Sequence, residues 1–134
     1  MMRFYYIILF CLLLIGCVPE STPHEFILKD LTITQITAPA SVPRLQPINI
    51  NIRMSGPDQC YRFSHFEIMS QNMLLHDVRA KASYPHPERG SVVCAPAVYT
   101  KDTTLTIQST VAGSHIFRFY NGPVLFKADT VQVN

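Results

Sequence analysis

The chain has 134 residues, a formal net charge of +2 and a hydrophobic fraction of 48%. Its charged residues alternate in sign along the sequence and form no basic block, whereas nucleic-acid binding needs a clustered positive surface. Composition therefore excludes a nucleic-acid partner and leaves room for one domain with a modest core.

The first predicted element is a secretory signal over residues 1–16. Arg3 precedes an apolar run of 13 residues from Phe4 to Gly16, and a membrane-spanning helix would need about 20. A positive start, a short apolar stretch and a small residue before the cleavage point are typical of signal peptides. The stretch Leu14-Ile15-Gly16-Cys17 resembles the lipobox of bacterial lipoproteins.

That resemblance implies that the signal is cut before Cys17 and that this cysteine carries a diacylglycerol thioether. Two or more acyl chains hold a protein stably in a bilayer, so the implied location is the bacterial cell envelope. Val18 follows the cysteine where Asp would favour inner-membrane retention, which indicates the outer membrane. An uncleaved anchor or an ordinary signal with an incidental cysteine are the alternatives, and the leaflet stays open.

Residues 17–27 are interpreted as a membrane-proximal tether and residues 28–134 as the folded domain. Cys11 leaves with the signal and Cys17 takes the lipid, so Cys60 and Cys94 remain. Two cysteines in an exported domain most simply form one disulfide. A metal or redox pair is the alternative, although neither cysteine lies in a C-x-x-C motif.

Hydrophobic residues then alternate with polar ones almost throughout, which is typical of half-buried strands. The run 48–54 is the clearest, with Ile48, Ile50, Ile52 and Met54 on one face and Asn49, Asn51 and Arg53 on the other. The same period occurs in residues 78–84, 103–110, 114–120 and 125–133. Turn signals separate the runs, among them Asn121-Gly122-Pro123, which predicts a hairpin.

In residues 61–68 the apolar parity changes near Ser64-His65. That change predicts either a β-bulge there or a strand covered on both faces.

Pro39, Pro43 and Pro47 lack amide donors, so this segment predicts a broken edge strand leading into the strand at Ile48. The rhythm of strands over residues 28–134 resembles immunoglobulin-like domains, and it implies an all-β antiparallel sandwich of about seven to nine strands. The sequence departs from that family at two points. It has no tryptophan, and His115 stands where many such domains have a corner tyrosine.

Catalysis is not expected. The pairs Ser64-His65, His76-Asp77 and Ser114-His115 are neighbours, and neighbours on a strand point to opposite faces. No G-x-S-x-G motif supplies a nucleophile.

Metal binding is a minor alternative. It would combine His65, Glu67 and His115 with soft ligands from Met54, Met69 and Met73. Neither a metal site nor a cofactor is expected.

The loop "YPHPERG" is the predicted contact site, with His86, Glu88 and Arg89 as its binding residues, because exposed loops often carry function. The predicted function is a non-catalytic binding or accessory role, with the membrane as one partner through Cys17 and an envelope protein or glycan as the other. A periplasmic inhibitor or a metal-handling lipoprotein is the alternative.

Overall fold

The computed structural model describes residues 25–89 and 92–134, which form nine strands and one short 3-10 helix. The strands are β1 (Phe26–Asp30), β2 (Thr32–Thr37), β3 (Ser41–Val42), β4 (Pro47–Gly56), β5 (Arg62–Ser70), β6 (Leu75–Pro85), β7 (Tyr99–Gln108), β8 (Gly113–Asn121) and β9 (Val124–Val133), and the 3-10 helix is η1 (Pro87–Arg89). The first strand begins two residues before the predicted domain boundary at residue 28. Within the described residues no helix is long and apolar enough to cross a membrane.

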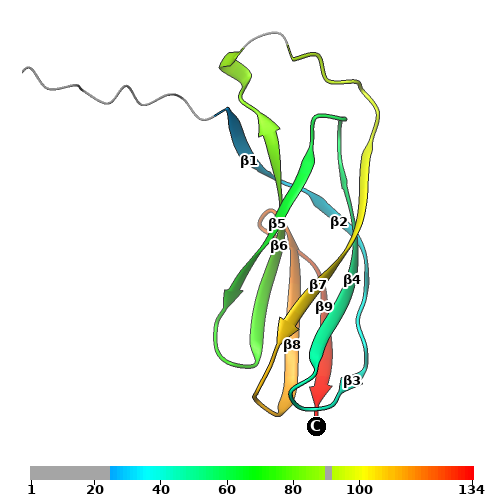
Figure 1. The fold of residues 1–134 in the computed structure, drawn as a ribbon, viewed down its shortest axis with the longest axis vertical. Coiled ribbons are helices and arrows are strands. Elements are labelled where there is room, and N and C mark those ends of the chain that lie inside the picture. The colour runs from blue at the N-terminus through cyan, green and yellow to red at the C-terminus, as the bar shows by residue number, and fades with distance from the viewer. Residues whose placement is uncertain (1–24, 90–91) are drawn as a thin grey trace, which may run out of the picture.

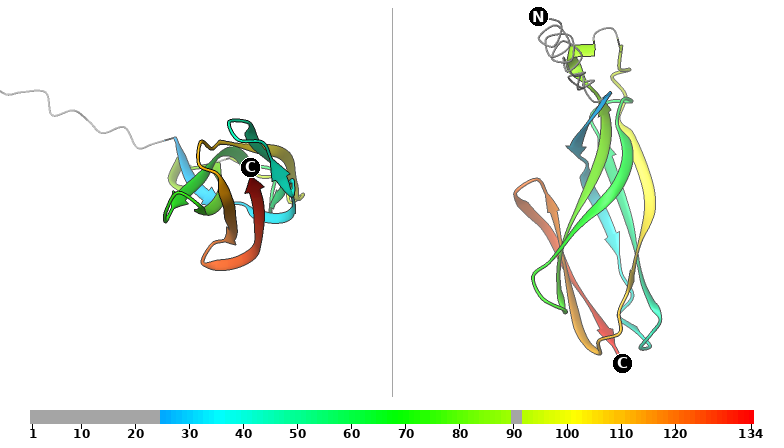
Figure 2. Two further views of the ribbon diagram at one scale, coloured as in Figure 1. Left: turned by 90° about the horizontal axis from the view of Figure 1, so that it is seen from below. Right: turned by 60° about the vertical axis from the view of Figure 1, so that its left-hand side comes forward.

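The strands form two packed sheets, as the sequence predicts for a sandwich (Figure 1). The larger sheet has the order β1-β6-β8-β9-β3 and holds β5 on β6 as well, while the smaller sheet has the order β2-β4-β7. The sandwich is elongated, and the C-terminus lies at the end opposite the start of β1 (Figures 1 and 2).

The expectation of a wholly antiparallel sandwich is wrong at two places. β3 pairs with β9 in parallel, and β6 pairs with β8 in parallel. Parallel neighbours need a crossover connection rather than a hairpin. For β6 and β8 that connection runs through η1 and through β7, which belongs to the other sheet.

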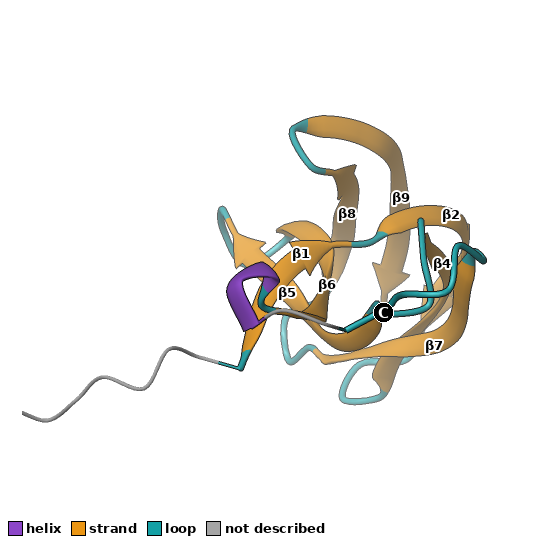
Figure 3. Cartoon of the chain, turned by 90° about the horizontal axis from the view of Figure 1, so that it is seen from above, coloured by secondary structure: helices purple, strands orange, loops and turns teal. Residues whose placement is uncertain are grey.

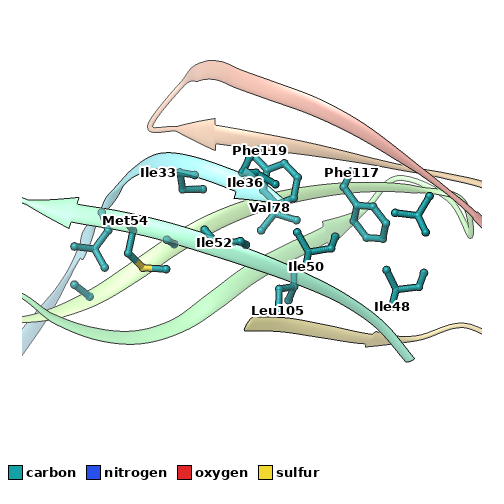
Figure 4. Packing of buried hydrophobic residues seen from close by; sticks show 14 of the residues in the cluster. Ile33, Ile36, Ile48, Ile50, Ile52, Met54, Val78, Leu105, Phe117 and Phe119 are labelled. Atoms are coloured by element: carbon teal, nitrogen blue, oxygen red, sulfur yellow. The ribbon is translucent and has the colours of Figure 1, made fainter. Parts of the chain in front are cut away.

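Alternating residues of both sheets build the core between them (Figure 4). In β4 the predicted inward residues are all buried, and the intervening Asn49, Asn51 and Arg53 are exposed. Phe117 and Phe119 of β8 lie opposite this row and are fully buried. Burying a side chain of this size contributes roughly 1.5–3 kcal/mol, so the strict period of two is the main source of stability.

The proline-rich segment, residues 39–47, includes the edge strand β3 of the larger sheet, as predicted. The chain leaves the smaller sheet after β2 and joins the larger sheet as the two-residue strand β3. Gln132 donates its amide to the Ala40 carbonyl at 3.0 Å. Pro39 and Pro43 flank this short pairing, because a strand of two residues leaves them outside the ladder.

Gly122 and Pro123 form the predicted hairpin turn between Asn121, which ends β8, and Val124, which begins β9, with Gly122 in the left-handed region at φ 58°. Asn121 also bridges the two sheets. Its side-chain oxygen accepts the Ile33 amide at 2.7 Å, and its side-chain nitrogen donates to the Ile33 carbonyl at 3.1 Å. The side chain thus takes the place of a neighbouring strand at a bulge of β2, where the register shifts between Ile33 and Gln35.

Of the two alternatives for the change of parity in residues 61–68, the structure shows the bulge, between Phe63 and His65. A strand covered on both faces is excluded, because β5 is largely exposed. The predicted disulfide is confirmed. Cys60 and Cys94 form a disulfide with a Cα–Cα distance of 5.3 Å. The bond holds the long connection between β6 and β7 against the segment that follows β4, where Gln59 also donates its amide to the Ala95 carbonyl at 3.1 Å.

We expect Asn121→Ala to lower the free energy of unfolding by about 2–3 kcal/mol, because it leaves two backbone groups of buried Ile33 without a partner. Urea denaturation followed by far-UV circular dichroism measures the change. Asn51→Ala is the control, since Asn51 is exposed and accepts only the Thr104 hydroxyl, and its effect should stay within about 0.5 kcal/mol. Equal effects of the two substitutions would contradict the bridging role.

Replacing both bonded cysteines, Cys60→Ser with Cys94→Ser, should lower the free energy of unfolding by roughly 3–4 kcal/mol. The physical reason is that the bond closes a loop with a sequence separation of 34 and thereby limits the unfolded chain. Urea denaturation of the parent chain with and without reductant should show the same difference. An unchanged midpoint after reduction would show that the bond adds nothing to stability.

Candidate functional site

A hollow of about 290 Å³ opens at the end of the sandwich that is opposite the start of β1. It lies between the β5–β6 turn and the β7–β8 turn, which reach this end together with the β3–β4 turn (Figure 1). Its lining residues are Met73, His76, Ile107, Gln108, Ser109, Thr110, Val111 and His115. We call it the distal hollow. A wider apolar depression of about 490 Å³ shares Met73 with it and extends along Leu74, Leu75 and Ile116.

Two buried histidines form the floor of the distal hollow. His76 on β6 is 7% exposed and His115 on β8 is 1% exposed. His76 Nε2 lies 3.2 Å from His115 Nδ1, and the two ring planes are nearly parallel, at 5°. The ring of Phe117 packs on His76 with a centroid distance of 5.0 Å.

A chain of hydrogen bonds runs through these rings. Ser70 Oγ lies 3.0 Å from His76 Nδ1 at one end, and His115 Nε2 lies 2.9 Å from the Val111 carbonyl and 3.0 Å from Ser109 Oγ at the other. A carbonyl only accepts, so His115 Nε2 carries the hydrogen and His115 Nδ1 accepts one from His76 Nε2. His76 Nδ1 then accepts from the Ser70 hydroxyl. This assignment satisfies every ring nitrogen with both rings neutral.

Burial lowers the pKa of His76 below its usual 6.5, and the neighbouring ring of His115 lowers this pKa further. A second proton on the pair would place two N–H groups against each other or force the Ser70 hydroxyl to turn. Burial and the hydrogen bonds of the distal hollow therefore both favour the neutral form of His76.

The opposite face of the same strand pairing holds an ion pair. Arg118 on β8 donates to both oxygens of buried Asp77 on β6, at 2.6 and 2.9 Å. The hydrogen bonds from Arg118 lower the pKa of Asp77, and Gln71 acts in the same direction. Tyr120 lies beside two guanidinium groups, Arg79 at 5.2 Å and Arg118 at 5.9 Å from its ring centroid.

The exposed face of the smaller sheet carries a polar groove of about 280 Å³ across β2, β4 and β7. Its polar groups are paired across the strands, as in the bond of 2.8 Å from the Thr104 hydroxyl to Asn51 and the two bonds from Arg53 to Asp102 at 2.8 and 3.2 Å. Exposed pairs of this kind stabilise a sheet only modestly. The groove has no buried polar side chain, so we place the candidate site in the distal hollow instead.

The predicted contact loop lies at the other end of the sandwich. His86 donates its amide to the Glu25 carbonyl at 3.1 Å and accepts the Glu88 amide on Nδ1 at 3.3 Å. Arg89 ends the 3-10 helix η1. Figure 3 shows η1 beside the start of β1. The predicted lipid site, Cys17, lies outside the described residues.

The structure does not assemble the predicted metal ligands. His65 and Glu67 pair with outward residues of β6, whereas His115 points inward with Phe117. Met54 is buried in the core, and only Met73 reaches the distal hollow. Asp58, Cys60 and Cys94 also lie close together, but both cysteines are held in the disulfide and offer no thiolate.

One part of the argument against catalysis is wrong. Ser64 Oγ lies 3.0 Å from His65 Nδ1, because the bulge turns these two neighbours toward the same side. His65 is exposed, and within residues 25–89 and 92–134 no third group forms a hydrogen bond that would orient its ring. The absence of enzymatic activity stays a prediction.

Sequence reasoning missed the pair of His76 and His115, because these residues are 39 positions apart. A signal was nevertheless present. Each histidine continues the buried face of its own strand, His76 before Val78 and His115 before Phe117. Two histidines at inward positions of different strands indicate a shared buried polar site.

No protein-family model, curated protein or solved structure matches the chain. Its function is therefore inferred from its own residues and geometry.

We expect the free energy of unfolding to fall as the pH is lowered from about 7.5 to 5. The lowered pKa of His76 means that the unfolded chain takes up the proton first, so this stability is present above about pH 6.5 and is lost below it. Asp77 has its pKa lowered from 3.8, so its stabilising contribution is constant over this range and is lost only below about pH 3.8. Urea midpoints across this range test the expectation.

His76→Gln should flatten that pH dependence, while His65→Gln, at an exposed position, should leave it as in the parent chain. If His65→Gln flattened the dependence and His76→Gln did not, the buried pair would not be its source.

Proposed function

We propose that the chain is a lipid-anchored binding protein of the bacterial cell envelope, and that it takes an envelope protein or glycan at the distal hollow. The observation that carries this proposal is the position of the hollow. It lies at the end of the sandwich opposite the start of β1, where the chain comes from the lipobox (Figure 1). A protein anchored through Cys17 would hold the distal end away from the membrane.

The chemistry of the distal end supports a binding role. Met73 and Leu45 are 75% and 67% exposed on two turns there, and large apolar side chains at exposed positions mark contact surfaces when they gather. Leu45 has a φ of 69°, a conformation that side-chain-bearing residues rarely adopt. Such backbone strain concentrates at binding and catalytic sites. Around the buried histidines, Gln108, Ser109 and Thr110 add polar groups for orienting a ligand.

We also assign the sandwich to the immunoglobulin-like type. Two features support this assignment: the edge segment that changes sheets between β2 and β3, and the bond from His115 to the Val111 carbonyl four residues upstream. The second resembles the corner contact that a tyrosine makes in such domains. The parallel pairing of β6 with β8 is a departure from their antiparallel pattern.

Metal handling is the second candidate, because Met73, His76 and His115 line one hollow. Imidazole and thioether groups together suit copper. The hydrogen on His76 Nε2 would have to move to Nδ1, with the Ser70 hydroxyl turning to accept it, before a metal entered between the rings. Binding of silver(I), used as a redox-inert probe, would then be abolished by His115→Gln. Tight silver binding that persists in this variant would exclude the site.

We expect the parent chain, expressed in a bacterium, to sediment with membranes and to gain acyl mass on the fragment that begins at Cys17. Cys17→Ser should abolish the added acyl mass, since the thiol that carries the lipid is then absent. Intact mass spectrometry of both chains measures the effect. A parent chain without acyl mass, or a Cys17→Ser chain that keeps it, would contradict lipid anchoring through Cys17.

A photo-reactive side chain at Met73 should cross-link the anchored protein to a defined partner in cells. The same group at Glu88, an exposed position at the opposite end, is the matched control and should give no adduct. Adducts formed only from position 88 would move the binding site to the loop around η1 and would contradict the distal site.

A further inference from the structure

The outer edge of β9 is free over most of its length. β8 covers one edge of β9, and β3 pairs with the other edge only at Gln132 and Val133. Among the described residues no strand pairs with the outer edge of residues 124–131, and the pairing of β9 with β8 shifts register between Leu125 and Lys127. A free edge of this length is a template for strand addition.

The backbone polar groups that point to this edge can be identified. Gln132 donates its amide outward, to Ala40, at 3.0 Å. Since antiparallel strands alternate the direction of successive residues, Thr130 and Ala128 also direct their amide and carbonyl groups outward. Thr130 supports this, because its amide is bonded at 3.2 Å only locally, by the carboxylate of Asp129.

The charges on this edge are complementary to those on the β9 edge of a second copy in antiparallel orientation. Lys127 Nζ lies 2.9 Å from Asp129 Oδ2, and the two side chains are 46% and 30% exposed. They flank Ala128 symmetrically. In an antiparallel pairing of β9 with a second β9 that sets Ala128 opposite Ala128, each Lys127 faces an Asp129 of the second copy.

We propose that two copies of this chain associate edge to edge through β9, with the two-fold axis passing between the two Ala128 residues. The central residues of this register, Lys127, Ala128 and Asp129, lie in the regular part of the free edge, after the register shift at Phe126. The outward amide and carbonyl of each Ala128 then form a reciprocal pair of hydrogen bonds. Such an interface is isologous and closes as a dimer.

The neighbouring registers do not give this match. Centring the axis on Phe126 sets Lys127 opposite Leu125, and centring it on Thr130 sets Lys127 opposite Val133, which β3 already covers. Opposite charges placed directly across a strand pair stabilise it, and unmatched ones do not. One register is therefore favoured by the charges.

The edge is accessible. The β8–β9 hairpin extends away from the rest of the sandwich (Figures 2 and 3). Val124, Leu125 and Phe126 on it are 64%, 48% and 41% exposed. The residues that line the distal hollow include none from β9, so the dimer and the proposed binding function stand independently.

The decisive experiment is a mixing experiment with charge variants of the full chain in detergent, followed by sedimentation velocity. The parent chain should sediment as a dimer. In a dimer of Lys127→Asp, acidic residues would face each other at both pairs of positions 127 and 129. In a dimer of Asp129→Lys, basic residues would face each other at the same positions. Each variant alone should therefore be monomeric. An equimolar mixture of the two should form a heterodimer, because every cross-strand pair is then complementary.

Three further chains complete the test. The double exchange of Lys127→Asp with Asp129→Lys should restore the homodimer. Ala128→Pro should give a monomer with an unchanged circular dichroism spectrum, because proline removes only an amide that points away from β8. Asp102→Lys on the smaller sheet is the matched control and should remain dimeric. A monomeric parent chain, dimers of both single variants, or a mixture that stays monomeric would each overturn the proposal.

Discussion

The parallel pairing of β6 with β8 is the contact on which the larger sheet depends. It is short, from Leu75 opposite Ile116 to Val78 opposite Phe119, and it joins the β5–β6 hairpin to the β8–β9 hairpin. An isolated hairpin is at best marginally stable in water. Once joined, the two hairpins present one continuous apolar face to the smaller sheet, and the core of the sandwich can form between them.

The two faces of this pairing hold different chemistry because successive residues of a strand point to opposite sides. His76 faces inward and meets His115, while Asp77 faces outward and meets Arg118. A neutral pair suits the inner face, since an unpaired charge there would be costly. An ion pair suits the outer face, where water reaches the guanidinium of Arg118. The register that pairs β6 with β8 therefore also brings the two histidines together at the base of the distal hollow.

Much of the fold could be predicted from the sequence because it follows from patterns among residues that are close in the chain. The alternation of residues 48–54 predicts β4 and its buried face, the three prolines predict the broken edge, and the change of parity near Ser64 predicts the bulge of β5 as one of two alternatives. The prediction of the disulfide assigns Cys11 to the signal and Cys17 to the lipid, which leaves Cys60 and Cys94 to pair. Each of these inferences needs only residues that are close in sequence or a count of residue types.

What could not be predicted depends on contacts between distant segments. Hydrophobic periodicity gives the inward face of a strand but not its neighbour, so the parallel pairing of β6 with β8 was not foreseen. The buried histidine pair was missed for the same reason. The loop with His86 was chosen for its exposure and its prolines, and no sequence pattern reveals that it lies at the opposite end from the hollow.

The edge of β9 illustrates how an unpaired strand edge can still discriminate between partner strands. Charged residues on edge strands generally discourage pairing with foreign strands. Lys127 and Asp129 do so here, because an apolar strand laid along β9 would remove water from this ion pair and bring no further opposite charge to it. A second copy in antiparallel orientation is different, since it brings the opposite charge to each position. The same two residues that discourage unspecific strand addition therefore favour a single partner and a single register, which is how specificity arises from differences in affinity.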